Sequence, residues 1–324
     1  MIFDCLFLLA GLFLIVKGGN IFVSASVRVA EYLHMPRVVI GSTLVSLATT
    51  SPEITVSILS GLRGEPGLAV GNAVGSCICN LCLVLGVMAA VKQVATNPKT
   101  VRSAMLAMIG CGLLLLASSF NFQLGKGHGL LLVILGVFYF YYDFQKHYRA
   151  ARPRELVEAR RIETEMVHSH PWLRTGLGTT VLFTMGMAMV VAGSKLLIEA
   201  AVGVATEMGI SPMLIGLTVI AFGTSLPELV TALSSARQNV SDLAVGNILG
   251  ANVANLTLVI GSAASLSDVV IDRVTQFYSF PALVLAMFIA WHMITSKDRV
   301  SRVEGGGLLL YYVLFLAGLV ALSW

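Results

Sequence analysis

The amino-acid sequence predicts an all-α membrane protein with ten transmembrane helices arranged as two inverted repeats of five helices each. Three observations predict this class: the composition, the recurrence of long apolar stretches, and a repeated set of motifs. Hydrophobic residues make up 56% of the 324-residue chain and charged residues 12%, with a mean hydropathy of +0.86. Soluble domains carry about a quarter charged residues. We therefore expect the chain in a lipid bilayer.

The apolar stretches are long enough to cross the hydrocarbon core, which takes about 20 residues as a helix. The ten predicted spans are 2–27, 38–60, 68–91, 101–119, 128–144, 176–203, 212–236, 243–267, 275–295 and 305–323. The first span contains Asp4 and has no basic residue before its apolar run, so it is not expected to be a cleaved signal peptide. The predicted organisation is a first five-helix repeat over 1–145, a cytoplasmic basic loop over 146–174 and a second, inverted repeat over 175–324.

The basic residues sort by membrane side. With the N-terminus outside, alternating loops place 16 of the 21 Lys and Arg residues on one side and three on the other, while Lys17 and Lys195 fall within spans. The positive-inside rule makes the richer side cytoplasmic. We expect a multi-pass protein of the cell (inner) membrane, with the central loop cytoplasmic and both termini outside. Because the Lys and Arg residues are distributed according to the side of the membrane, the net charge of +4 does not indicate a nucleic-acid partner.

Two histidines and three cysteines are further possible metal ligands. His168 and His170 in the central loop suit a metal, but a solvated loop is the favoured interpretation. Cys77, Cys79 and Cys82 suggest a soft-metal site, yet only the last two share a helical face. We expect these cysteines to be reduced packing residues.

A repeat with a constant register of 175 residues organises the chain. It aligns LAVGNAVG, which begins at Leu68, with LAVGNILG, which begins at Leu243, with six of eight residues identical. The register also pairs Thr49 with Thr224, Glu53 with Glu228, Ser76 with Ala251, and Asn80 with Asn255. An odd number of spans in each copy inverts the second copy relative to the first. Inverted repeats are a recurring plan of secondary transporters, with the site at the repeat interface; the alternative is a duplicated scaffold without a transport role.

Two acids lie deep inside predicted spans. Glu53 is three residues from the midpoint of its span, about 4.5 Å of helical rise, and Glu228 repeats this position. An intramembrane acid indicates a functional site, because burying its charge is costly. A single such acid could instead be a neutral structural residue, an interpretation that a repeated pair disfavours. Pro52 and Pro227 precede the acids, and each frees the carbonyl four residues back.

Neutral oxygen ligands accompany the acids. Asn72, Ser76 and Asn80 recur every four residues and so follow one helical face, and hydroxyl side chains precede both prolines. The set contains carboxylates, amides, hydroxyls and freed carbonyls, but no His. Hard cations prefer such oxygens, and Ca²⁺ takes about 6–8 of them.

The motifs ATTSPE at Ala48 and GTSLPE at Gly223, each followed by an LAVGN segment, resemble the two alpha-repeats of the cation/calcium exchanger superfamily, including prokaryotic sodium/calcium exchangers. The resemblance implies central Ca²⁺ ligands at Glu53 and Glu228. It implies further oxygens from Thr49 and Thr224, with Asn80 and Asn255 bordering the same site. It also implies flanking monovalent-ion positions at Thr50, Ser225, Ser76 and the carbonyls of Ser46 and Ala221.

This chain departs from the family pattern at several positions. Ala48 replaces the usual Gly, Thr50 and Ser51 replace Ser and Leu, and Cys77 replaces Asn. Ala251 stands where a Ser is expected, which removes one oxygen from an expected Na⁺ position.

The sequence therefore predicts a secondary active antiporter that exchanges Ca²⁺ for Na⁺ by alternating access at a mid-membrane carboxylate site. The resemblance implies that spans one and six move against the rest. An H⁺-coupled cation antiporter stays open, because two neighbouring acids share a proton readily. A passive cation channel also stays open. No HExxH or other complete catalytic motif lies within a span, so we expect no enzyme activity, no catalytic residue and no bound cofactor.

Overall fold

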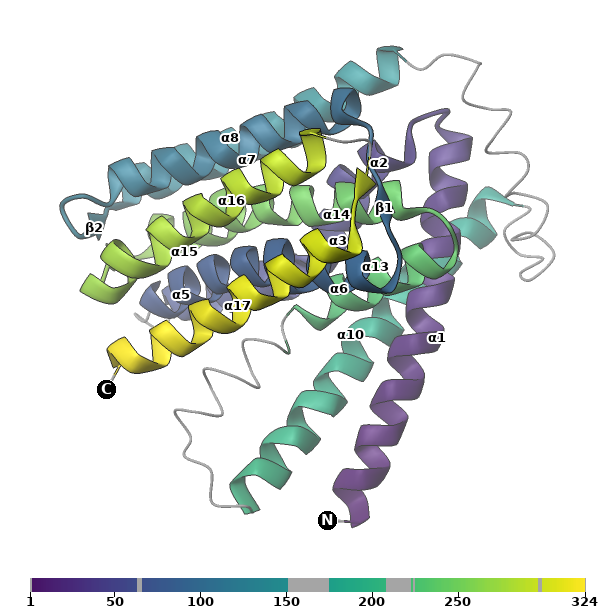
Figure 1. Ribbon diagram of the computed structural model, residues 1–324, viewed down its shortest axis with the longest axis horizontal. Coiled ribbons are helices and arrows are strands. Elements are labelled where there is room, and N and C mark those ends of the chain that lie inside the picture. The colour runs from purple at the N-terminus through teal and green to yellow at the C-terminus, as the bar shows by residue number, and fades with distance from the viewer. Residues whose placement is uncertain are drawn as a thin grey trace.

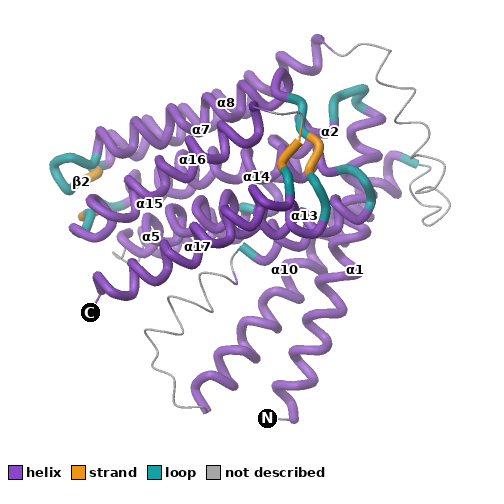
Figure 2. The backbone as a smooth tube through the Cα atoms, in the orientation of Figure 1, coloured by secondary structure: helices purple, strands orange, loops and turns teal. Residues whose placement is uncertain are grey.

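The computed structural model describes residues 2–62, 66–150, 175–207, 223, 225–296 and 299–323. These residues are helical apart from short connections and four two-residue strands. Most of the long helices run side by side in one bundle, while α1 (Ile2–Tyr32) and α10 (Gly176–Glu207) project from it as a pair (Figure 1). Figure 2 shows that the strands lie in the connections between helices.

In the described part of the first half, eleven elements follow α1. They are α2 (Arg37–Ile40), η1 (Gly41–Val45), α3 (Ser46–Thr49), α4 (Ser51–Leu62), α5 (Pro66–Ile78), η2 (Cys79–Val84), α6 (Leu85–Val91), β1 (Val94–Ala95) and α7 (Pro98–Ser118), followed by β2 (Gln123–Leu124) and α8 (Lys126–Ala150). The elements named η are π-helical.

The described second half continues the series after α10. Its elements are α13 (Leu226–Arg237), α14 (Ser241–Ala254), η6 (Asn255–Val259), α15 (Ile260–Leu266), β3 (Val269–Val270), η7 (Thr275–Ser279), α16 (Phe280–Ser296), β4 (Arg299–Val300) and α17 (Arg302–Ser323). Several bounds repeat the first half at the 175-residue register predicted from the sequence. The bounds of α4 fall on those of α13, those of α6 on those of α15, and those of β1 on those of β3.

Eight helices in the described part of the chain are long and apolar enough to cross a membrane. The predicted span 38–60 is not one continuous helix, because α3 ends at Thr49 and α4 begins at Ser51. Pro52 explains the break, since it has no N–H to donate to the Ala48 carbonyl. The Ser51 hydroxyl takes over that role, donating to the Ala48 oxygen at 2.7 Å. Most of the predicted span 212–236 lies outside the described residues, and its end forms α13.

The strands join the two halves crosswise. β1 pairs antiparallel with β4, with Val94 opposite Val300, and β2 pairs antiparallel with β3, with Gln123 opposite Val270. Each pair therefore takes one strand from each half.

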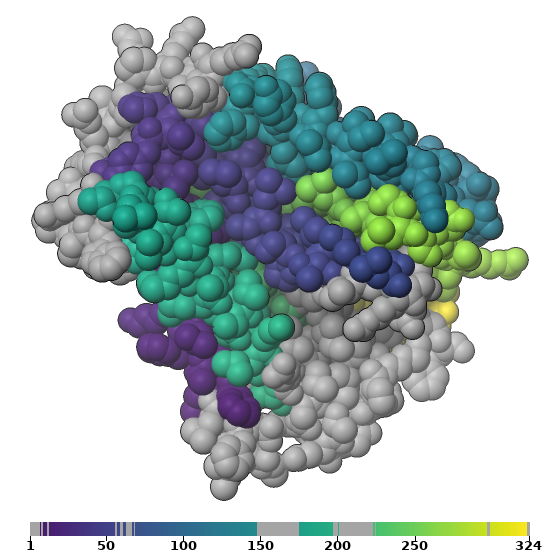
Figure 3. Space-filling view, turned by 180° about the vertical axis from the view of Figure 1, so that it is seen from behind, coloured from purple at the N-terminus to yellow at the C-terminus, as the bar shows by residue number. Residues whose placement is uncertain are grey.

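Close contact between glycines joins α1 to α10. A Cβ on Gly18 would lie 2.7 Å from the Met189 Cβ, and a Cβ on Gly193 would lie 2.7 Å from the Gly11 carbonyl oxygen. Small residues let helix backbones approach closely in membranes. Figure 3 shows the same pair from the opposite side, packed against each other.

Candidate functional site

Two buried acids occupy equivalent positions in the two halves. Glu53 lies in the first turn of α4 and Glu228 in the first turn of α13, and each is 1% exposed. Glu228 is close enough to Glu53 for the two charges to repel. The partial positive charge at each helix N-terminus favours a carboxylate in this position. Two half-helices thus direct their N-terminal turns, each carrying an acid, toward one region.

Eight buried oxygen atoms at this region have no hydrogen-bond partner among the residues that the structure describes. They are Thr50 Oγ1, Glu53 Oε2, Ser76 Oγ, Asn80 Oδ1, Ser225 Oγ, both Oε atoms of Glu228, and Asn255 Oδ1. Nearly all buried polar groups in native proteins have a partner, because leaving one unpaired costs free energy. All eight belong to residues that the sequence analysis selected, and they form a donor set suited to a hard cation.

The carboxylates are too few to hold such a cation without neutral ligands. Within the ranges that the structure describes, no group of three or more His, Cys, Asp and Glu side chains is arranged around a common metal position. Hydroxyl and amide oxygens would have to complete any coordination shell around the two acids.

The end of α3 contributes a partly paired edge of the site. The Thr49 hydroxyl lies 3.2 Å from the Ser46 carbonyl oxygen and 3.1 Å from Asn247 Oδ1 on α14. The Ser46 carbonyl also accepts the backbone N–H of Thr50 at 2.9 Å. Thr49 therefore joins the first half to the second beside the acids, while the neighbouring Thr50 hydroxyl is left without a partner.

Asn80 and Asn255 both lie where an α-helix gives way to a π-helical segment. Asn80 is the second residue of η2 and Asn255 the first residue of η6, and each is 1% exposed. A π-helical turn accommodates an extra residue and occurs frequently at functional sites. The sequence analysis named both amides but not this local geometry.

Residues related by the 175-residue register meet across the junction of the two halves. Cys77 donates from its Sγ to the Asn252 carbonyl at 3.7 Å, and Asn252 donates from Nδ2 to the Cys77 carbonyl at 3.5 Å. Glu53 and Glu228 are related in the same way. The site thus lies at the junction of the two halves.

Some site residues were missed or lie outside the described part. Thr224 and Ala221 lie outside the described residues, as do His168 and His170. Asn252, which the sequence analysis did not select, is fully buried beside Asn80; its position as the repeat mate of Cys77 was the available signal.

The cysteines were expected only to pack. Cys79 is buried, and it lies beside Ser225 and close to both acids. Its thiol therefore lies at the edge of the site, a position that the spacing of the cysteines did not indicate.

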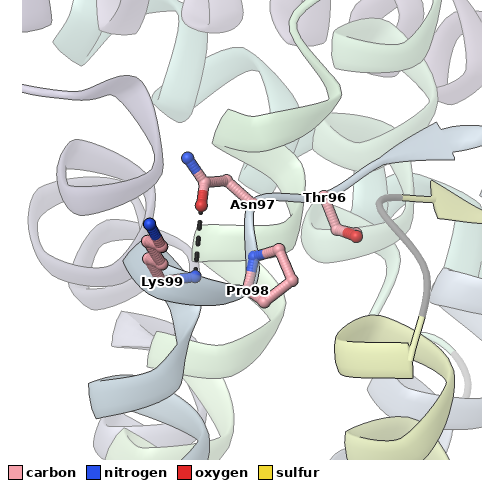
Figure 4. Close-up of a pocket in the computed structure, with 4 residues that line it drawn as sticks. All are labelled: Thr96, Asn97, Pro98 and Lys99. Atoms are coloured by element: carbon pink, nitrogen blue, oxygen red, sulfur yellow. Dashed lines mark hydrogen bonds between the residues drawn. The ribbon is translucent and has the colours of Figure 1, made fainter.

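A separate pocket lies where β1 leads into α7. Its lining residues are Thr96, Asn97, Pro98 and Lys99, and the Asn97 side chain accepts the backbone N–H of Lys99 at 3.1 Å (Figure 4). None of these residues belongs to the buried cluster around the acids.

Comparisons with known proteins find relatives and a similar fold along nearly the whole chain. A family model described as sodium/calcium exchanger protein matches residues 4–145 and 178–321. The putative antiporter CaxA of Alkalimonas amylolytica is 32% identical, over 97% of both chains. The sodium/calcium exchanger MaX1 of Methanosarcina acetivorans is 29% identical, over 96% of this chain and 97% of its own. A solved structure of the sodium-calcium exchanger NCX_Mj, soaked with zero Na⁺ and Ca²⁺, superposes with a TM-score of 0.82 at 26% identity and covers 98% of this chain and 99% of that one.

Proposed function

Because this chain belongs to the sodium/calcium exchanger protein family, we propose that it is a secondary antiporter that exchanges Ca²⁺ for Na⁺ across a lipid bilayer. The family is one of transporters rather than enzymes. The single observation that carries the proposal is the set of eight unpaired buried oxygens around Glu53 and Glu228. Cations bound among them would give these oxygens the partners that the described residues do not supply.

The central position suits Ca²⁺. Glu53 and Glu228 supply the charge that offsets a divalent ion, and Thr49 and Thr224 add oxygens from the residues that precede each acid. Asn80 and Asn255 border the same position with their carboxamide oxygens. Ca²⁺ takes about 6–8 oxygen ligands in an adaptable geometry, so this mixed set is chemically appropriate.

The flanking positions suit a monovalent ion. The unpaired hydroxyls of Thr50, Ser76 and Ser225 lie on the elements next to the acids, and the carbonyls of Ser46 and Ala221 would complete the Na⁺ positions. The Ser46 carbonyl already accepts two hydrogen bonds, so it would have to share its second lone pair with the ion.

The proposed architecture is ten spans in two inverted repeats, over 1–145 and 175–324, joined by a cytoplasmic segment over 146–174 whose first residues, 146–150, form the end of α8. The repeated element bounds and the crosswise strand pairs support it. The span 38–60 is broken between α3 and α4, which is tolerated at membrane depth where the backbone lines a cavity or an ion site. Both termini would lie outside the cell membrane.

Alternating access would come from α1 and α10 moving against the remaining helices. The pair projects from the bundle (Figure 1) and its helices contact each other through glycines, so it forms a unit distinct from the rest. Coupling follows because an empty site with two buried charges is too costly to move through the membrane centre. The site must therefore carry either Ca²⁺ or Na⁺ when it changes sides.

Radiolabelled Ca²⁺ uptake into proteoliposomes at a fixed membrane voltage tests the proposal. Uptake should require Na⁺ inside the vesicles and should be lost in Glu53→Gln, which keeps the side chain's shape and removes its charge. Uptake driven by a proton gradient but not by a Na⁺ gradient would identify H⁺, not Na⁺, as the coupling ion. Uptake without any counter-ion gradient would indicate a channel and would refute exchange.

A further inference from the structure

The amides of Asn252 and Asn80 form a chain of hydrogen bonds across the junction of the two halves. Asn252 on α14 is fully buried. Its Nδ2 lies 3.5 Å from the backbone carbonyl oxygen of Cys77, and its Oδ1 accepts from Nδ2 of Asn80 at 3.2 Å. The far end of this series of hydrogen bonds is Asn80 Oδ1, which has no partner among the described residues.

The carbonyl oxygen of Cys77 fixes the direction of the hydrogen bonds in this series. A carbonyl oxygen can only accept a hydrogen bond, so the amide nitrogen of Asn252 must face Cys77. The amide oxygen of Asn252 then faces Asn80, which must present its own nitrogen in return. The oxygen of Asn80 is thereby directed away from Asn252, into the cluster of unpaired oxygens.

The second copy has a weaker version of the same contact. The repeat mate of Asn252 is Cys77, whose side chain lies against Asn255. Its Sγ donates its only hydrogen toward the Asn252 carbonyl at 3.7 Å, so toward Asn255 it offers only sulfur lone pairs. Sulfur is a weak acceptor compared with an amide oxygen. Asn255 is thus less firmly oriented than Asn80.

We propose that Asn252 is a positioning residue that directs the carboxamide oxygen of Asn80 toward the transported cation, and that Cys77 leaves the equivalent oxygen of Asn255 more loosely held. The inference rests on the proposed function, because it assigns a role at the same cation site. It makes the two copies contribute unequally to affinity, although the acids that they carry are equivalent.

Exchanging the two side chains tests the inference by equilibrium binding of radiolabelled Ca²⁺ to the purified full-length chain. Asn252→Cys should weaken binding about fivefold, which corresponds to about 1 kcal/mol, the net contribution of one hydrogen bond. Cys77→Asn should tighten binding, since it gives Asn255 an amide partner. A melting curve for each variant checks that it is folded.

A thermodynamic cycle separates positioning from packing. If Asn252 acts through Asn80, then Asn252→Cys should cause no further loss in an Asn80→Ala background. An equal loss in both backgrounds, or no loss in the wild-type background, would overturn the inference while leaving the Ca²⁺ site in place. Absence of Ca²⁺ binding by the wild-type chain would overturn the proposed function and this inference together.

Discussion

Replacing Glu228 by Gln gives a sharp test of the shared site, because the amide preserves shape and removes only charge. Glu228 is buried, and neither of its carboxylate oxygens has a hydrogen-bond partner in the described part of the chain, so solvent screens this carboxylate weakly. Removing one member of a buried pair of opposite charges, here the Glu228 carboxylate bound to Ca²⁺, costs about 3–5 kcal/mol. Since about 1.4 kcal/mol is a factor of ten, Ca²⁺ affinity should fall by about two to four orders of magnitude.

The same substitution should leave the ion-free protein at least as stable as the wild type. Two neighbouring buried carboxylates destabilise each other when both are ionised, and Gln removes one of these groups. Ca²⁺ at 100 times its dissociation constant should stabilise the wild type by about 2.7 kcal/mol, and this gain should disappear in Glu228→Gln. Melting curves with and without Ca²⁺, together with uptake into proteoliposomes, measure both effects.

A matched control is available on α17. Glu304 accepts hydrogen bonds from the backbone and hydroxyl of Ser301 at the start of that helix, and Gln is an accepted substitute in such a capping arrangement. Glu304→Gln should therefore transport Ca²⁺ normally. Near-normal uptake by Glu228→Gln, or a retained Ca²⁺ stabilisation, would refute the reasoning.

Three further variants probe other features. Ala251→Ser should lower the Na⁺ concentration for half-maximal Ca²⁺ efflux about fivefold, the value of one added polar contact, and an unchanged Na⁺ requirement with unchanged Ca²⁺ affinity would place this residue outside a Na⁺ position. Burial raises the pKa of Asp272, but hydrogen bonds, among them those from Thr275, lower it by more, so the pKa lies below its ordinary value. This carboxylate therefore stabilises the folded state at pH values above its unfolded-state pKa, and the stabilisation is lost as the pH falls through its folded-state pKa. Asp272→Ala should lower the free energy of unfolding by about 1 kcal/mol at neutral pH and by less in acid. Melting curves at two pH values measure the difference. Gly246→Ala should destabilise the protein by about 1–3 kcal/mol, because its Cβ would lie 2.0 Å from a backbone oxygen, whereas Gly306→Ala, with no described atom within 4 Å of its Cβ, should melt like the wild type.

Much of the architecture could be predicted because it depends on patterns that composition and spacing express directly. Hydropathy predicted the long helices, and the 175-residue register predicted the matching bounds of α4 and α13. The proline before Glu53 predicted an interruption, and the structure places it at Thr50. The sequence analysis selected Glu53 and Glu228 because a charged residue at membrane depth is costly and therefore indicates a functional site.

Other features depend on contacts that spacing alone does not express. The sequence around Asn80 and Asn255 is compatible with an ordinary α-helix, so spacing does not indicate the π-helical turns that the structure has there. The partner of Asn80 is a residue 172 positions away, so its identity depends on how two distant helices meet. Cys79 was assigned to packing because its position near the acids also depends on how distant helices meet.

The crosswise strand pairs make each half of this chain incomplete by itself. A half separated from the other would expose the edges of two strands, because β1 finds its partner in β4 and β2 in β3. Unpaired strand edges favour association with another chain. Two identical halves could satisfy all four edges by associating with each other around a two-fold axis, as in a self-complementary homodimer. The present chain therefore has the geometry expected of a dimer whose two subunits have become covalently joined, and splitting the gene within the central loop should yield two fragments that assemble only when produced together.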